Sequence, residues 1–228
     1  MQNAPPVQDL IAARQTSKVL RDPNTRLPLT DSQQTALATA LEAMLAAAHQ
    51  APFHKAAHGP SHCQGSLASI VPWRAYLIDQ ATCWQLIDRI AERAKAEPES
   101  TWAKAQGSKI PPLLSAAAAL IQVNWCPNRA DDSSVPLNTA NAEHIAAAAA
   151  AVQNMLLSAS HHGIANYWST GGILREPALQ AMLGIEPGGQ PLASIFLSFP
   201  TDGDTIKTGA MRDLKGSVAD WSKRVSLT

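Results

Sequence analysis

Apolar residues recur every three or four positions in several stretches of the chain, and this spacing predicts amphipathic helices. One stretch opens with Thr30 and Gln33, a pair that predicts a capping box, and it ends before Pro52. Helices are predicted within residues 7–18, from Thr30 to about His49, and over residues 81–97 and 176–183.

The most regular pattern lies between Asn141 and His162, where apolar residues, mostly alanine, occupy nearly every face. Gly163 follows as a typical C-cap. A helix that is apolar all round has no face suited to water, so this segment predicts a long central helix that is buried.

Short apolar runs bounded by Gly, Pro and polar residues predict strands. These runs cover residues 73–78, 119–125, 164–169 and 193–199. Strands and helices alternate without repeats, and no linker divides the chain. The pattern therefore predicts one α/β-type domain over residues 1–228, with an extended Gly-, Pro-, Ser- and His-rich loop at about residues 55–71.

Composition narrows the functional classes. Of the 228 residues, 46% are apolar and 16% are charged, against a globular average of about 25% charged. The low charge and abundant alanine suggest that helix surface is buried against another subunit. The 18 basic and 18 acidic residues balance, so no electrostatic footprint for nucleic acid is present.

The three cysteines Cys63, Cys83 and Cys126 are an odd number and widely spaced, which favours a reducing compartment. The first residues lack the apolar core of a signal peptide. The most apolar run, Ile145–Val152, is far shorter than the roughly 20 residues of a membrane span. These features predict a soluble, cytoplasmic protein.

A histidine cluster between residues 49 and 63 raises the possibility of a metal site. His54, His58 and His62 are four residues apart, and Cys63 offers a fourth ligand. However, Pro52, Gly59 and Pro60 interrupt any helix that would align the rings, and no second ligand cluster exists. A solvated loop without metal is the favoured interpretation, and a metal-binding dimer is the alternative.

Three common enzyme motifs are missing: the dinucleotide G-x-G-x-x-G, the P-loop, and the hydrolase G-x-S-x-G. Two weaker segments remain. Arg14–Lys18 places two cations and two hydroxyls at a helix end, which suits a phosphate, although a solvated helix end is the simpler interpretation. Tyr167–Gly172 follows a strand and offers backbone groups to a flat heteroaromatic ring, or is an ordinary core and turn.

Together with other segments, these two resemble the FMN-dependent nitroreductase family, especially its short single-domain members. The resemblance covers nearly the whole chain. The matching segments, in order, are Arg14–Lys18, His49–Lys55, Pro72–Tyr76, Ala119–Trp125, Gln153–Leu157 with Gly163, Tyr167–Gly172 and Pro191–Leu197.

The resemblance implies an α+β, nitroreductase-like fold: a central, mainly antiparallel sheet flanked by helices, with the long buried helix at a dimer interface. It implies a homodimer with two FMN sites at that interface. Arg14, Thr16 and Lys18 match the segment that holds the FMN phosphate and ribityl chain, with Gln15 as a backbone donor. Arg212 matches the C-terminal cation that completes the phosphate site, while Ala210 stands where a second cation is frequent.

The remaining cofactor contacts are also implied by the resemblance. Gln50 and His54 match a loop that the partner subunit contributes. Positions 168–171 match the segment that lines the isoalloxazine, namely Trp168, Ser169, Thr170 and Gly171. The chain departs from the family pattern in its longer loop before Pro72 and in Val71, where a Gln is usual.

The implied reaction takes hydride from NAD(P)H onto FMN and passes it to a nitroaromatic, a quinone or a related small acceptor. In such enzymes the flavin carries the chemistry, so no catalytic side chain is expected. Two alternatives keep the fold: a flavin-dependent oxidase or dehydrogenase acting on a small metabolite, and a non-catalytic flavin-binding protein.

Overall fold

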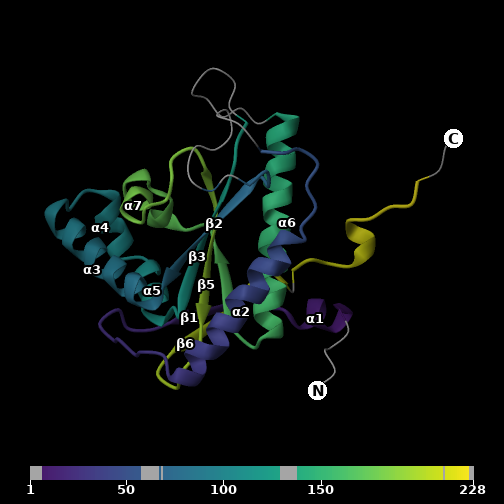
Figure 1. The fold of residues 1–228 in the computed structure, drawn as a ribbon. Coiled ribbons are helices and arrows are strands. Elements are labelled where there is room, and N and C mark those ends of the chain that lie inside the picture. Colours follow the sequence, from purple (N-terminus) through teal and green to yellow (C-terminus); the bar gives the residue numbers. More distant parts are fainter. Residues whose placement is uncertain (1–6, 58–66, 68, 129–137, 213, 226–228) are drawn as a thin grey trace.

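The computed structural model describes residues 7–57, 67, 69–128, 138–212 and 214–225. At its centre lies a four-stranded, fully antiparallel sheet with the strand order β2-β3-β5-β4 (Figure 1). The strands are β2 (Trp73–Asp79), β3 (Ala119–Trp125), β4 (Ala165–Ser169) and β5 (Gln190–Ser198). A separate antiparallel ribbon pairs β1 (Ser17–Leu20) with β6 (Thr205–Thr208). The expected α+β architecture with an antiparallel sheet is confirmed.

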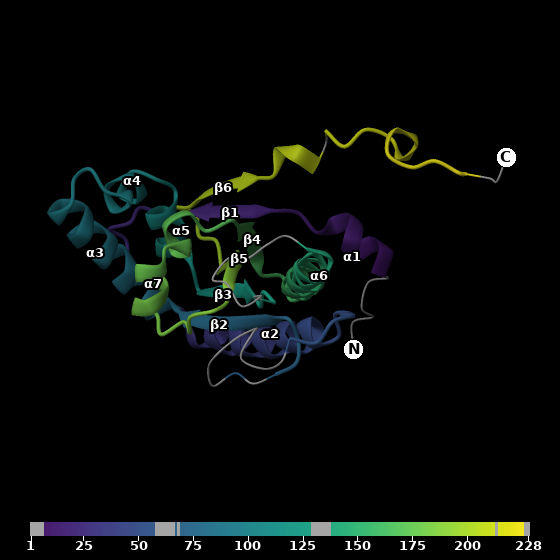
Figure 2. The same ribbon diagram turned by 90° about the horizontal axis from the view of Figure 1, so that it is seen from above.

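Helices cover both faces of the sheet. One face carries α2 (Asp31–His49) and α6 (Thr139–His161), which pack on it through one hydrophobic cluster. The other face carries a second cluster under shorter helices (Figures 1 and 2). These are α3 (Gln80–Ala96), α4 (Thr101–Gln106), α5 (Ile110–Ala116), the 3₁₀ turn η1 (Gly172–Arg175) and α7 (Pro177–Met182).

Strand β3 explains why the sheet is central. Every one of its residues is buried, and its side chains alternate between the two clusters. Ile121, Val123 and Trp125 face α2 and α6, whereas Leu120 faces the α3 side. Burial on both faces accounts for the nearly continuous apolar run that predicted this strand.

Helix α6 packs closely on α2, and four of its nine buried positions are alanine, among them Ala148 and Ala151. Within this chain the burial is one-sided, since Ala142, Ala146 and Gln153 are exposed. The prediction of a long central helix is confirmed. Within the single chain, however, this helix is not buried on every face.

The predicted helix over residues 7–18 is too long. Helix α1 (Val7–Ala13) ends before Arg14, and Ser17 and Lys18 belong to β1. Arg14 and Lys18 therefore do not share a helix face. The reason is tertiary: β1 is extended because its backbone pairs with β6 near the other end of the chain. The sequence pattern also missed α4, α5 and β6, while the Thr30–Gln33 capping box is confirmed.

Candidate functional site

The pairing of β1 with β6 brings two distant segments together. Ser17 lies opposite Thr208, so the residues just before β1 lie beside those just after β6. The approach is close at Gly209, where a Cβ atom would lie 3.2 Å from Cβ of Thr16. A larger residue at position 209 would push the two segments apart.

A cavity of about 600 Å³ lies at this junction. Three of its lining residues are cations, Arg14, Arg212 and Lys215, and none is a carboxylate in the part of the chain that the structure describes. Neutral polar groups also line this cation cavity, namely Gln15, Thr16, Gln153 and Thr208, and Ile11, Gly209 and Met211 complete the lining. Uncompensated positive charge beside hydroxyl and amide groups suits a phosphate monoester.

Arg212 belongs to the 3₁₀ turn η2 (Ala210–Arg212) and is fixed by backbone acceptors. Its Nη1 donates to the carbonyl of Arg14 (2.8 Å), and its Nη2 donates to the carbonyl of Ala12. Both carbonyls lie at the C-terminal end of α1, where a helix presents unpaired acceptors and partial negative charge. The contact orients the guanidinium and leaves other N–H donors for a ligand.

Arg14 is destabilised as a cation in this setting. Burial, and secondarily the positive charge of Arg212, lower the pKa of Arg14 from its usual value. None of the ion pairs found among the described residues involves Arg14, Arg212 or Lys215. A bound anion would reverse this unfavourable electrostatic environment.

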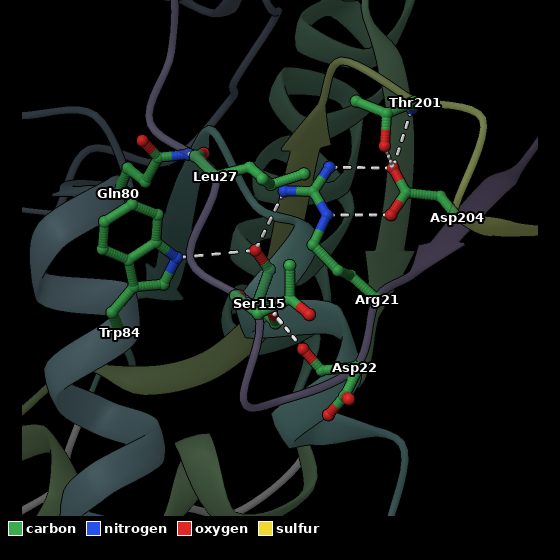
Figure 3. Close-up of polar contacts among 9 residues, drawn as sticks. Arg21, Asp22, Leu27, Gln80, Trp84, Ser115, Thr201 and Asp204 are labelled. Carbon is green, nitrogen blue, oxygen red and sulfur yellow. Dashed lines mark hydrogen bonds and ion pairs between the residues drawn. The ribbon is translucent and has the colours of Figure 1, made fainter.

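A buried ion pair joins the two strands of the β1–β6 ribbon at one end (Figure 3). Arg21, directly after β1, donates from Nε and Nη2 to the two carboxylate oxygens of Asp204, directly before β6, both at 2.8 Å. The side chains are 6% and 1% exposed. Burial would raise the pKa of Asp204, but the Arg21 contacts and the hydrogen bonds from Thr201 outweigh it, so the pKa is lowered.

Ser115 of α5 ties this ion pair to the neighbouring loop (Figure 3). Arg21 Nη1 donates to the Ser115 carbonyl (3.3 Å). The Ser115 hydroxyl lies within hydrogen-bond distance of the carbonyls of Asp22 (2.9 Å) and Thr25 (2.7 Å). The arrangement holds both strands of the ribbon, and hence the cation cavity, against the helices of the α3 side.

Lys18 lies apart from this cation cluster. Its Nζ sits 4.8 Å from the ring centroid of Tyr167 on β4, a cation–π contact across the gap between the ribbon and the sheet. Lys18 is not among the residues that line the cation cavity. The structure thus brings Arg14, Gln15, Thr16 and Arg212 together, and it places Lys18 on β1 with its side chain against Tyr167.

A second cavity, of about 730 Å³, opens at the far end of β1. Leu20 of β1, Ser169 of β4 and Gly172 line it, together with residues of α4, α5 and their connection. The four residues of β1 span roughly 13 Å, so the strand bridges the two cavities. The predicted phosphate end and the predicted ring-lining segment therefore lie at opposite ends of one strand.

The segment from Trp168 to Gly171 does not face one space. Trp168 packs on the cluster beneath α2 and α6, whereas Ser169, on the opposite face of β4, lines the second cavity. Thr170 is exposed, and its carbonyl accepts a bond from Arg175 Nη1 (3.4 Å). Gly171 has φ +100° and lies so close to Ser194 that a Cβ atom would be 2.7 Å from its hydroxyl oxygen.

Gln50 and His54 line neither cavity within this chain. Gln50 is the C-cap of α2, donating its backbone N–H to Ala47 and Ala48 carbonyls, and both residues are exposed. Their expected contact with the partner's cofactor stays a prediction.

Sequence reasoning missed six residues of the cation cavity as site residues: Ile11, Gln153, Thr208, Gly209, Met211 and Lys215. Gln153 had a signal, because it is a polar side chain in the middle of the alanine-rich helix α6. Gly209 and Lys215 had none, since their places depend on the β1–β6 pairing.

Several other chemical groups bear on alternatives. His58, His62 and Cys63 lie outside the described residues, which contain no group of three or more metal-ligating side chains. Cys83 and Cys126 are buried, and burial, together with the negative charge of Asp79, raises the pKa of Cys83 above its usual range. Among the described helices, none is long and apolar enough to cross a membrane.

Comparison with known proteins places these features in context. The family model of the nitroreductase family matches residues 32–197, more than half of the chain. No curated protein sequence matches. The fold is similar to that of an FMN-bound nitroreductase from Bacteroides fragilis (19% identity, TM-score 0.56, covering 97% of this chain and 100% of that one).

Two further solved structures are similar in fold. The FMN-dependent nitroreductase NfnB from Mycobacterium smegmatis, in complex with NADPH, has 14% identity and a TM-score of 0.58 over 96% of this chain and 97% of its own. The nitroreductase CinD from Lactococcus lactis, in complex with chloramphenicol, has 12% identity and a TM-score of 0.59 over 97% and 100%.

Proposed function

Because the chain belongs to the nitroreductase family, we propose that it is an FMN-dependent oxidoreductase. The observation that carries the proposal is the cavity in which Arg14, Arg212 and Lys215 meet without a carboxylate among its described lining residues. This donor set fits the phosphate of FMN. FMN is bound in the similar structure from Bacteroides fragilis, and the similar enzyme from Mycobacterium smegmatis is FMN-dependent.

The chemistry of each lining residue suits a particular part of the cofactor. Arg14, Arg212 and Lys215 would hold the phosphate through charge-assisted hydrogen bonds, with the Thr16 hydroxyl as a neutral partner. The amides of Gln15 and Gln153 suit the hydroxyls of the ribityl chain. The direction of β1 then leads the ring toward Lys18 and the segment Trp168–Gly171.

The proposed reaction needs little from the protein beyond binding and orientation. Bound FMN would supply the redox chemistry, taking a hydride from NAD(P)H and passing reducing equivalents to a nitroaromatic, a quinone or a related small acceptor. The similar structures that hold NADPH and chloramphenicol support this choice of partners. The second cavity, apolar at Leu20, Ile110 and Ile173, suits a flat ring.

The proposal predicts that the purified protein is yellow and carries about one FMN per chain. NADH or NADPH should bleach the flavin absorbance, and menadione or a nitroaromatic should restore it. Stopped-flow absorbance measures both steps. Bleaching by a small metabolite instead of NAD(P)H would favour an oxidase or dehydrogenase, a flavin inert to both would favour a flavin-binding protein, and protein that binds no flavin would refute the proposal.

We also propose a homodimer, on the basis of two uncovered apolar surfaces. One is the face of α6 that carries Ala142 and Ala146. The other is the C-terminal segment, residues 209–212 and 214–225, which leaves the body of the molecule as an extended arm (Figures 1 and 2). This arm carries large exposed apolar side chains, namely Met211, Leu214, Val218, Trp221 and Val225. A second copy of the chain would bury them. In each copy the loop with Gln50 and His54 follows α2, which packs on α6, so this loop would lie near the proposed interface.

The dimer can be tested on the arm. Replacing Leu214 and Trp221 together by serine should weaken the dimer at least tenfold, because each loses buried apolar area. Sedimentation equilibrium measures the change. Leu77→Ser provides the matched control, since Leu77 is equally apolar and 50% exposed but lies on the edge strand β2. A wild-type protein that is monomeric at micromolar concentration would contradict the proposed assembly.

A further inference from the structure

A row of polar residues crosses the centre of the sheet, where apolar side chains are the rule. Ser169 of β4 lies opposite Ser194 of β5, and Ser194 lies opposite Gln122 of β3. Residues directly opposite one another on antiparallel strands point to the same face of the sheet. All three are buried, with Ser194 and Gln122 0% and 1% exposed.

Hydrogen bonds continue this row in one direction. The Ser194 hydroxyl donates to Gln122 Oε1 (2.6 Å), and Gln122 Nε2 donates to Asn124 Oδ1 (3.4 Å). Asn124 Nδ2 donates to Gln180 Oε1 (3.1 Å), and Gln180 Nε2 donates to the carbonyl of Leu174 (3.2 Å). Each side chain donates to the next, and the chain of four ends on backbone.

The two ends of this polar chain meet the two ends of one turn. Leu174, the terminal acceptor, lies in η1, and Gly171, the N-cap of η1, sits directly over the Ser194 hydroxyl. Gly171 is fixed further, because its N–H donates to the Ser169 hydroxyl oxygen (3.1 Å). The polar chain therefore spans beneath the turn from Gly171 to Leu174.

Filling space does not require such an arrangement. Apolar residues of similar volume would fill the interior without leaving any polar group unsatisfied, whereas an interrupted polar network leaves buried donors and acceptors unpaired at a cost in stability. The polar chain bonds the backbone of the turn at Leu174, and its other end, the Ser194 hydroxyl, lies directly under Gly171. The turn between these two residues adjoins the second cavity. Preorganised backbone of this kind is what a bound ring needs on one side.

We propose that Ser194, Gln122, Asn124 and Gln180 form a positioning network that holds the turn Gly171–Leu174 and thereby sets the environment of the flavin ring. This inference rests on the proposed function for the identity of the ring. None of the four residues lines the cation cavity, so the network acts through the turn and not on the phosphate. Gln122 is the central member, because its removal separates Ser194 from the amides.

The test interrupts the network at its centre. Gln122→Met keeps the length of the side chain and removes both polar atoms. Amide hydrogen exchange of residues 171–175, followed by mass spectrometry, should become about tenfold faster, the factor that loss of one net hydrogen bond corresponds to. The midpoint potential and the visible circular dichroism of bound FMN should change, whereas FMN retention should change little.

Ser194→Ala and Ser198→Ala form a matched pair on the same strand. Both serines are buried on β5, but only Ser194 belongs to the network, so only Ser194→Ala should reproduce the faster exchange at the turn. Should Gln122→Met fail to fold, Gln180→Met interrupts the same network nearer the surface.

Two results would overturn the network: unchanged exchange at residues 171–175 in the Gln122 or Gln180 variant, or equal effects of Ser194→Ala and Ser198→Ala. Exchange is measured on the protein whether or not flavin is bound. Absence of flavin would therefore contradict the proposed function, whereas exchange in the variants that is as slow as in the wild type would contradict this inference.

Discussion

Replacing Asp204 by alanine is expected to destabilise the folded protein by about 3–5 kcal/mol, the usual effect of removing one partner of a buried ion pair. The side chain of Asp204 is 1% exposed and accepts two bonds from the side chain of Arg21, which is 6% exposed. The variant leaves the Arg21 guanidinium buried without its counter-charge. Urea unfolding followed by circular dichroism measures the difference in the free energy of unfolding.

Two variants separate the ion pair from a general effect of lost charge. Glu92→Ala removes a partner of Arg89 in a pair whose side chains are 60% and 64% exposed, and it should change stability by less than about 1 kcal/mol. The double replacement Arg21→Met with Asp204→Leu should recover part of the loss, because no unpaired charge remains buried. If Asp204→Ala lowered the free energy of unfolding no more than Glu92→Ala does, the buried pair would contribute no more to stability than an exposed one.

The same pair predicts the direction of pH dependence. The pKa of Asp204 is lowered in the folded state, so its carboxylate stabilises the fold fully above the pKa of the unfolded chain, about 3.9. This stabilisation is lost as the pH falls through the lowered pKa. The stability gap between wild type and Asp204→Asn should therefore be constant near neutrality and shrink below about pH 4.

Replacing Arg14 by alanine is expected to weaken FMN binding by about 1.5–3 kcal/mol, roughly 10- to 150-fold, through loss of a charge-assisted contact. Arg14 lines the cation cavity, and burial together with Arg212 already disfavours its charge there. Fluorescence titration of the flavin-free protein measures the affinity.

Riboflavin, which lacks the phosphate, is the discriminating ligand for this prediction. Arg14→Ala should leave riboflavin affinity nearly unchanged, and Arg89→Ala, on the surface of α3, should affect neither ligand. Raising the salt concentration should weaken FMN binding more than riboflavin binding, because screening acts on the charged contact. Equal losses for FMN and riboflavin would place the phosphate elsewhere.

Part of the candidate site could be identified from the sequence alone. Arg14, Thr16 and Arg212 were identified by resemblance, and the structure brings them to one cavity. Lys18 was expected beside Arg14 on a helix end, but it belongs to β1 and contacts Tyr167. Gly209 and Lys215 were not identified, because nothing around them distinguishes cavity residues from a solvated tail.

What the sequence by itself determined are the elements with local signals: the capping box that starts α2, the apolar run of β3, and the alanine-rich length of α6. Caps and periodicity act within a few residues, so they can be recognised without knowing the rest of the chain.

Only the tertiary structure decided the β1–β6 ribbon. All four residues of β6 are exposed, so the strand has no apolar alternation to reveal it. It forms because backbone groups pair between opposite ends of the chain and because Arg21 and Asp204 are buried together. The cation cavity depends on this ribbon, since strand pairing and not local pattern sets Thr16 beside Gly209 and Arg14 beside Arg212.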